Sequence, residues 1–230
     1  MSCQNPGIFR AFTDKQGINF MEIDLHAGDE IPDLNQFDGL WVMGGSMNVW
    51  EEDKYPWLID EKQAIHHAIE DLNMPFLGIC LGHQLVAEAL GGRAEKTDNY
   101  EVGLFGIEPT EEGLNHPLLN NFRKSDKWVN VHLVEVVKAP KEAVILATSS
   151  NCQNHVMQLG EFAYSYQFHP EVCDYTLDGW MKIPGIPEAI EDLLGAGSLD
   201  YFKSSITENL PANNAASLTL FENWCNLVFN

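Results

Sequence analysis

Short apolar runs alternate with longer amphipathic stretches along most of this chain. Leu40–Met43 and Phe76–Ile79 are such runs, and residues 55–72 between them place apolar side chains at helical spacing. Buried strands that alternate with helices are typical of an α/β fold with a parallel sheet. We expect further strands at residues 101–108, 128–133 and 143–147, and a β-hairpin formed by residues 155–159 and 162–168.

The first 25 residues predict a helix and then a strand. Asn5 and Pro6 suit the start of a helix and Gly17 suits its end, so a helix is expected over residues 6–16 and a strand over residues 18–25. An α/β domain usually opens with a strand, and no apolar run precedes this helix. We therefore expect that the first strand of the sheet is missing from the sequence.

Beyond Cys173 the pattern becomes irregular, because prolines and glycines interrupt it. Short helices are expected at residues 188–194 and 199–206, within an atypical helical insertion near residues 182–212. A closing helix is expected at residues 217–229, where apolar residues recur at helical spacing. The simplest organisation is a single domain over residues 1–230.

Composition argues against a nucleic-acid-binding, membrane-spanning or disulfide-rich protein. The 230 residues carry 13 Lys and Arg against 34 Asp and Glu, a net charge of −21, which leaves little basic surface for nucleic acid. No run approaches the roughly 18 apolar residues that a membrane span requires, and no signal peptide is visible. Five cysteines without C-x-x-C spacing indicate reduced thiols and neither a disulfide framework nor a zinc motif, so we expect a cytoplasmic protein that contacts no membrane.

Cys80 directly follows the run Phe76–Ile79 and lies between Gly78 and Gly82, before a helical pattern begins. This is the cysteine version of the strand–turn–helix elbow that carries a nucleophile. A helix N-terminus behind the thiol favours the thiolate. The structural alternative is a buried cysteine that ends a core strand, and two flanking glycines argue against it.

A cysteine nucleophile needs a base and a group that orients the base. His169 stands at the expected end of a strand, and Glu171 lies two residues further on the same face, so Cys80, His169 and Glu171 form a candidate triad. The backbone N–H groups of Leu81 and of the Gly44–Gly45 loop are the candidate oxyanion hole. This chemistry is acyl transfer to water.

These motifs resemble those of the class I (triad) glutamine amidotransferases. The resemblance rests on Gly78–Gln84, Met43–Gly45 and Gln167–Glu171, and it covers roughly residues 6–180. Through Gly44–Glu52 it is greatest for stand-alone members that resemble the glutaminase domain of GMP synthase.

The resemblance implies a flavodoxin-like three-layer α/β/α sandwich with a mostly parallel central sheet. It implies hydrolysis of glutamine to glutamate and ammonia through a thioester on Cys80, without a metal or an organic cofactor. It also assigns Gln84 to the amino-acid end of the substrate. Similar members carry a histidine where His132 lies, near the mouth of the site, and Glu101 lies near where substrate would enter. The alternative for His132 is a hydrogen-bonded structural histidine.

Three functions stay open at this point. The first is a glutaminase whose ammonia is used by a separate synthetase, because the chain has no P-loop pattern and little room for a fused synthetase domain. The second is a hydrolase that uses the same triad on γ-glutamyl peptides or amines. The third is a catalytically idle relative that binds or regulates a partner, although the intact Cys80, His169 and Glu171 argue against it.

Overall fold

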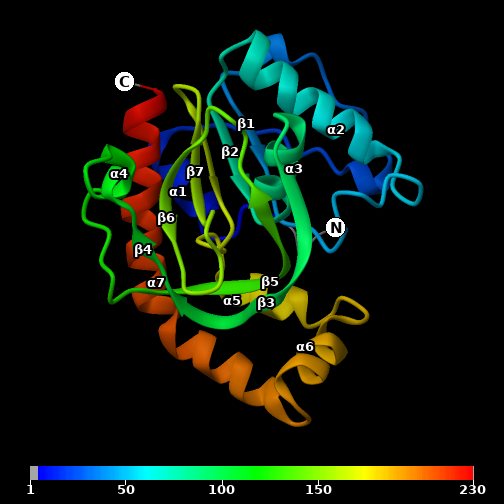
Figure 1. Cartoon of the computed structure of the whole chain (residues 1–230), viewed down its shortest axis with the longest axis vertical. Helices are drawn as coiled ribbons and strands as arrows, with labels where there is room; N and C mark the ends of the chain where they lie inside the picture. The colour runs from blue at the N-terminus through cyan, green and yellow to red at the C-terminus, as the bar shows by residue number, and fades with distance from the viewer. Residues whose placement is uncertain (1–4, 230) are drawn as a thin grey trace.

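The computed structural model describes residues 5–229 (Figure 1). The strands of this part are β1 (Leu40–Val42), β2 (Phe76–Ile79), β3 (Arg93–Gly106), β4 (Glu108–Pro109), β5 (Lys127–Lys138), β6 (Val144–Thr148), β7 (Val156–Leu159) and β8 (Ala163–Tyr166). The α-helices are α1 (Phe9–Gln16), α2 (Trp57–His66), α3 (Leu81–Ala89), α4 (Glu111–Leu114), α5 (Asp174–Trp180), α6 (Ile186–Leu194) and α7 (Ser198–Val228). Short 3₁₀ turns cover Leu25–Ala27, Leu34–Gln36 and Pro117–Leu119, and a π-helical turn, His67–Asp71, extends α2.

The main sheet has the strand order β1-β2-β8-β7-β6-β4. β1, β2 and β8 are parallel neighbours, whereas β7, β6 and β4 join through antiparallel pairings. β6 therefore points the same way as the three parallel strands, and most of this sheet runs in one direction. The predicted strands at residues 76–79, 143–147 and in the hairpin all belong to it, and the buried run Phe76–Ile79 lies near its middle.

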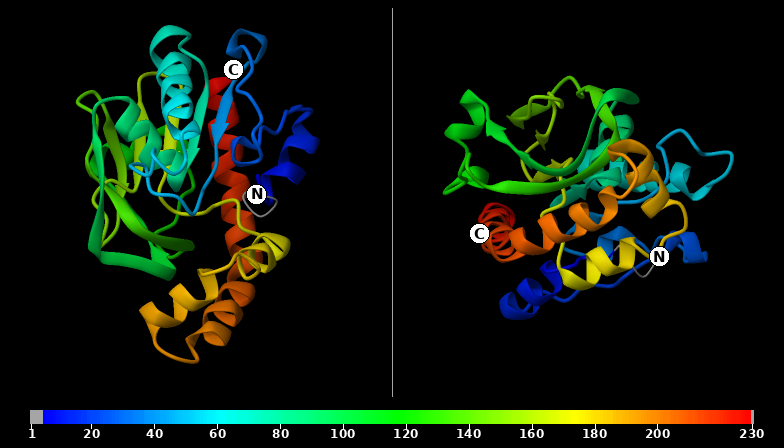
Figure 2. Two further views of the ribbon diagram at one scale, coloured as in Figure 1. Left: turned by 90° about the vertical axis from the view of Figure 1, so that its right-hand side faces the viewer. Right: turned by 90° about the horizontal axis from the view of Figure 1, so that it is seen from below.

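Helices cover both faces of the main sheet (Figure 2). α2 and α3 bury residues such as Leu58, Ile65 and Leu85 on one face. On the other face, α1 and α7 bury an aromatic cluster that includes Phe9 and Phe221. The three-layer α/β/α arrangement predicted from the sequence is thus observed.

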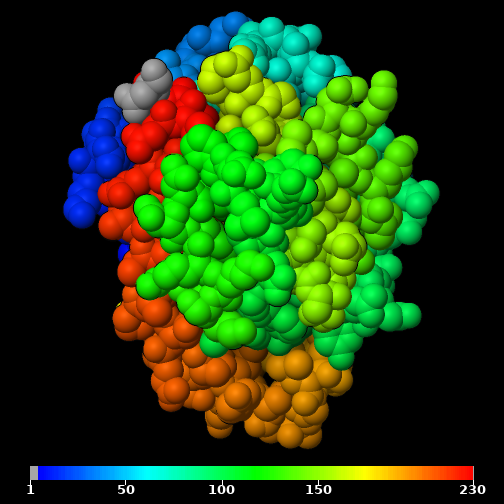
Figure 3. All heavy atoms as spheres, turned by 60° about the vertical axis from the view of Figure 1, so that its left-hand side comes forward, coloured from blue at the N-terminus to red at the C-terminus, as the bar shows by residue number. Residues whose placement is uncertain are grey.

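A second, two-stranded sheet of β3 and β5 curves below the main sheet. Its lower face packs on α5, α6 and the first half of α7 through a separate apolar cluster, which includes Val129 and Phe202. α6 and the start of α7 form the lower end of the molecule (Figure 3). The predicted strands at residues 101–108 and 128–133 are confirmed, but both β3 and β5 are longer than predicted.

The predicted strand over residues 18–25 is wrong. These residues are irregular up to a 3₁₀ turn at Leu25, and they pair with no strand in the described chain. Met21 is 62% exposed, so the apolar pattern of the segment does not mark a buried face. A strand needs a neighbour for its backbone groups. The described residues contain no strand before β1, which is an edge strand of the main sheet.

Two helix predictions also need correction. α1 begins at Phe9 and not at Pro6, because the Asn5 side chain accepts a hydrogen bond from Gly7 in a turn before the helix. The separate helices expected at residues 199–206 and 217–229 are one helix of 31 residues that contains Pro211. An internal proline costs about 3 kcal/mol. A buried stripe that continues from Phe202 to Trp224 outweighs this cost.

Glu61 on α2 is half-buried, and its Oε2 atom is buried without a hydrogen-bond partner in the described chain. Burial raises the pKa of Glu61 from 4.5 to about 7. When folding raises the pKa of a carboxyl group, the group destabilises the folded protein at high pH. This destabilisation grows as the pH rises from the pKa of the unfolded state to the pKa of the folded state. Glu61→Gln is therefore expected to stabilise the protein by about 1–3 kcal/mol at pH 8, and by less at pH 5.

Urea denaturation at both pH values measures this difference in the free energy of unfolding. Glu70→Gln is the matched control, because Glu70 lies on the adjoining helical turn and is exposed. An equal effect of Glu61→Gln at the two pH values would contradict the assignment of the raised pKa.

Candidate active site

Cys80 occupies a sharp turn between β2 and α3. Its backbone has φ 52° and ψ −100°, a conformation that residues other than glycine rarely adopt. The Cys80 N–H donates to the Tyr166 carbonyl at 2.8 Å, so the turn continues the pairing of β2 with β8. Cys80 is 7% exposed and lies at the N-terminus of α3. Strand, strained turn and helix together fix the position of the sulfur atom.

Two glycines permit close packing around this turn. A Cβ atom on Gly82 would lie 2.1 Å from the Val42 carbonyl oxygen. One on Gly44 would lie 3.1 Å from His169 Cε1 and 3.5 Å from Cys80 Cβ. Gly82 therefore lets α3 approach β1, and Gly44 lies against both Cys80 and His169.

Gly82→Ala is expected to destabilise the protein by about 1–3 kcal/mol or more, because the added methyl group meets backbone and not a movable side chain. Chemical denaturation measures the loss. Gly106→Ala is the matched control, since a Cβ there meets only the flexible end of Lys127 within 3.4 Å. Equal stability of the two variants would show that α3 and β1 can separate at little cost.

His169 and Glu171 are positioned by segments on either side of them. His169 Nδ1 lies 2.7 Å from Glu171 Oε1, and both residues are buried. The His169 N–H donates to the Val129 carbonyl of β5, and the Ile8 N–H donates to the Glu171 carbonyl. The Trp180 ring of α5 packs edge-on against the imidazole, with 4.8 Å between ring centroids.

Charge stabilises the protonated form of His169. Burial alone lowers the pKa of His169, but the charge of Glu171, then that of Cys80, and hydrogen bonds with both raise it from 6.5 to about 10. The other ring nitrogen is free to serve Cys80, because Nδ1 is occupied by Glu171. An imidazolium beside the sulfur favours the thiolate. The arrangement suits a nucleophile, a base and an orienting carboxylate.

A small cleft of about 70 Å³ opens above these groups. Gly44 and Gly45 line it beside Cys80, while Leu81 supplies the first N–H of α3 directly after the sulfur. Such N–H groups at a helix start lack partners within the helix and can receive an oxyanion. The other lining residues are Asn5, Met43, Ser46, Val131, His169, Glu171, Trp180, Ile183 and Ile186.

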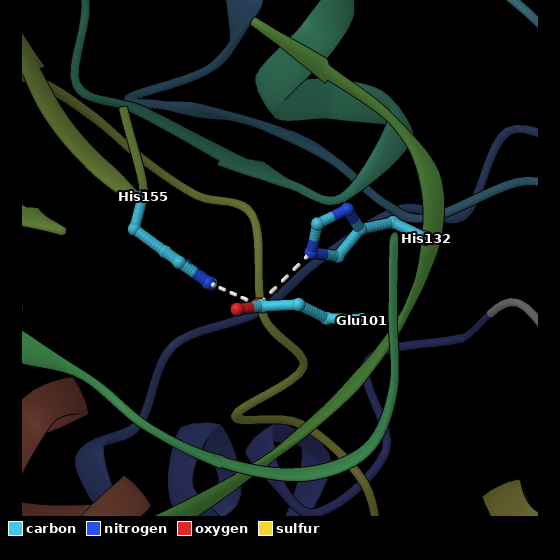
Figure 4. A group of neighbouring side chains, drawn as sticks. All are labelled: Glu101, His132 and His155. Atoms are coloured by element: carbon cyan, nitrogen blue, oxygen red, sulfur yellow. Dashed lines mark hydrogen bonds and ion pairs between the residues drawn. The ribbon is translucent and has the colours of Figure 1, made fainter. Parts of the chain in front are cut away.

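Three residues predicted to contact substrate do not line this cleft. Gln84 is buried, and its Nε2 donates to the Val134 carbonyl at 2.9 Å and to Gln167 Oε1 at 3.2 Å. Glu101 forms hydrogen bonds with both His132 and His155 in a separate buried cluster (Figure 4). Val131 lines the cleft, and its neighbour His132 projects from the opposite face of β5.

Sequence reasoning missed the apolar wall of the cleft and the third member of the buried cluster. The wall residues belong to no motif and reach the cleft through the packing of β5, α5 and the start of α6 with the turn before it; they are Val131, Trp180, Ile183 and Ile186. His155 opens the predicted strand at residues 155–159 and belongs to no motif, and only the folding of the chain brings it to Glu101. The available signal was weak, namely a histidine next to the apolar residues of a predicted strand.

A larger groove, of about 530 Å³, lies between residues 25–34 and α2. Its lining includes four carboxylates, Trp57 and His67, and it contains no cysteine. It lacks a nucleophile beside a base, so the cleft at Cys80 is the candidate active site.

The family model for class I glutamine amidotransferases matches residues 10–179, which include the elbow, the glycine loop and the pair His169–Glu171. The chain belongs to the class I glutamine amidotransferase family. Two relatives illustrate the similarity of this member of the family to known proteins. A putative glutamine amidotransferase-like protein, YfeJ, from Salmonella typhimurium is 30% identical and aligns over 79% of this chain and 77% of its own length. The matching component of the glutamine-hydrolyzing GMP synthase of Sulfolobus acidocaldarius is 34% identical over 62% of this chain and 71% of its own.

A solved structure supports the fold. The crystal structure of a glutamine amidotransferase from Thermotoga maritima has a TM-score of 0.82 and 25% identity, and the match covers 97% of this chain and 94% of that one. The predicted flavodoxin-like fold of the family is thus confirmed. Among the helices of residues 5–229, none combines the length and the apolar character that a membrane crossing demands.

Proposed function

We propose that this amidotransferase hydrolyses the side-chain amide of glutamine to glutamate and ammonia. The observation that carries the proposal is the strained Cys80 at the start of α3, next to His169, whose Nδ1 lies 2.7 Å from Glu171. The proposed roles are Cys80 as nucleophile, His169 as acid and base, and Glu171 as the residue that orients His169. No metal or organic cofactor is required by these steps.

The first half of the reaction forms a thioester. The Cys80 thiolate attacks the amide carbon, and the N–H groups of Leu81 and of the Gly44–Gly45 loop stabilise the oxyanion. The carbon–nitrogen bond then breaks while His169 gives its proton to the departing ammonia. Glu171 keeps the imidazole in the required tautomer throughout.

The second half releases glutamate. His169, now neutral, takes a proton from water, and the oxygen attacks the thioester carbon. The carbon–sulfur bond breaks, and the thiolate returns beside the imidazolium. Each turnover therefore consumes one water and leaves the three residues as they began. Gln84, Glu101 and His132 are proposed to support this chemistry from behind the cleft wall, as positioning residues.

Ammonia use is proposed to require a second protein. The matched relative from Sulfolobus acidocaldarius is named as one subunit of GMP synthase, and we propose by analogy that a separate synthetase accepts the ammonia made here. We also propose the cytoplasm as the compartment, because the four cysteines of the described residues are free thiols.

The same triad could act on γ-glutamyl amides, and the cleft offers one observation in favour. Trp180, Ile183 and Ile186 form an apolar wall at the site, which the departure of ammonia does not require. A γ-glutamyl compound with an apolar amine would bury its leaving group there. This second candidate shares every chemical step with the first.

Glutamate release from free glutamine and from a panel of γ-glutamyl amides and peptides tests both candidates. Turnover of glutamine supports an ammonia supplier, and a candidate synthetase should then raise the rate. Turnover of the amides without turnover of glutamine would replace the first candidate by the second. If folded protein hydrolyses neither, alone or with synthetases, both hydrolytic proposals fail and a binding or regulatory role is favoured.

A further inference from the structure

Glu101, His132 and His155 converge in the interior, away from the cleft (Figure 4). Glu101 comes from β3, His132 from β5, and His155 directly precedes β7. The Nε2 atoms of His132 and His155 lie 3.2 Å and 2.8 Å from the same carboxylate oxygen, Glu101 Oε2. All three residues are at most 3% exposed. Three segments far apart in sequence thus aim two nitrogens and one oxygen at one point.

Of the remaining polar atoms of this cluster, one has a hydrogen-bond partner and two have none among the described residues. Glu101 Oε1 accepts a hydrogen bond from the Ser149 hydroxyl at 2.5 Å, which fixes the plane of the carboxylate. The Nδ1 atoms of His132 and His155 are buried and have no hydrogen-bond partner within residues 5–229. Hydrogen bonding among the described side chains therefore leaves a polar atom of each imidazole unsatisfied, which is unusual for buried groups. The proposed reaction uses none of these atoms directly.

The geometry of the three ligand atoms fits a transition-metal ion. They all lie within 4.8 Å of one another. Zinc binds imidazole nitrogen and carboxylate oxygen at about 2.0–2.2 Å, so ligand atoms around tetrahedral zinc are separated by about 3.4 Å. Small side-chain movements would bring this cluster to that spacing. Two imidazoles and a single carboxylate suit zinc better than calcium or magnesium, which prefer oxygen ligands.

We propose that Glu101 Oε2, His132 Nε2 and His155 Nε2 bind one zinc ion in a structural site. Binding requires the proton of each neutral imidazole to lie on Nδ1, so that Nε2 presents its lone pair. Three protein ligands leave a fourth position for water. The sequence predicts no such site, because 31 residues separate Glu101 from His132 and 54 separate it from His155.

The position of the cluster indicates what the ion does. The cluster joins the β3–β5 sheet to the segment that leads into β7 of the main sheet. Both parts form backbone hydrogen bonds with the segment that carries the candidate catalytic histidine. The Val129 carbonyl of β5 accepts from the His169 N–H, and the His155 carbonyl accepts from the N–H of Gln167, two residues earlier. A bound ion would therefore stabilise the contact between the two sheets on which the position of His169 depends.

Metal-free protein without an affinity tag provides the test. Zinc is added, bound zinc is counted after gel filtration, and the midpoint of thermal unfolding is recorded with and without zinc. We expect one ion per chain and a rise of several degrees in the midpoint. Cobalt in place of zinc should give the visible absorption of a low-coordinate nitrogen and oxygen site.

His155→Gln and His132→Gln separate metal binding from hydrogen bonding, because a glutamine amide can still donate to Glu101 but is a poor zinc ligand. Each is expected to weaken zinc binding at least about 100-fold and to abolish the rise in the midpoint. His67→Gln is the matched control, because His67 is a surface histidine that contacts Asp71 and should leave both readouts unchanged.

Two outcomes would overturn the site. In the first, the wild-type protein binds clearly less than one zinc ion per chain and its unfolding midpoint does not change. This result can be interpreted without any variant. Alternatively, either glutamine variant could bind zinc as tightly as the wild type. In both cases the cluster is a hydrogen-bonded network alone. Neither readout depends on whether the protein hydrolyses glutamine.

Discussion

Cys80→Ala is expected to lower glutamate release by at least about 10⁴-fold, because the thioester through which both halves of the proposed reaction pass forms on the Cys80 sulfur. The substitution removes one buried atom at the start of α3, and the strained turn remains supported by the bond from the Cys80 N–H to Tyr166. Substrate binding should therefore survive the loss of turnover. Steady-state glutamate release and equilibrium binding of glutamine to the variant measure the two effects separately.

Cys225→Ala is the matched control for Cys80→Ala. Cys225 is a free thiol on α7, and burial raises the pKa of this thiol to about 11, so it is not a nucleophile at neutral pH. The control should keep wild-type activity. A thiol-directed electrophile at pH 7 should likewise modify Cys80 before Cys225. If Cys80→Ala retained more than about a hundredth of the activity, a covalent mechanism through this residue would be ruled out.

Local sequence was sufficient to predict the candidate triad, because each part of it is encoded over a few residues. The glycines on either side of Cys80 predict a tight turn, and in the structure Cys80 has a positive φ. His169 and Glu171 are two residues apart, and their side chains meet. The main strands and helices between residues 40 and 168 were likewise predictable from the spacing of apolar residues.

Elements that depend on distant partners were not predictable in the same way. Residues 18–25 alternate like a strand, but without a neighbouring strand the segment stays irregular. Pro211 predicts a break, yet long-range packing of α7 keeps the helix continuous. The apolar wall at Trp180 and the partnership of Glu101 with His155 exist only because separate sheets and helices meet. No spacing along the chain encodes either contact.

Glu171→Gln is expected to lower kcat by about 10³–10⁴-fold with little change in KM, because the amide can still contact His169 Nδ1 but no longer favours the imidazolium or the correct tautomer. The charge of Glu171 is the largest of the influences that raise the pKa of His169 toward about 10, and burial opposes them. Removing that charge lowers the pKa of His169. The variant should therefore hold the thiolate–imidazolium pair less well at neutral pH.

Rate against pH distinguishes this role from simple loss of structure. The wild type should keep its protonated imidazole well above pH 7, whereas kcat/KM of Glu171→Gln should already fall near neutral pH as the imidazole loses its proton. Glu161→Gln is the matched control, since Glu161 lies exposed in the β7–β8 turn. A folded Glu171→Gln variant with a wild-type kcat and pH profile would show that His169 needs no carboxylate. The triad would then reduce to a Cys80–His169 dyad.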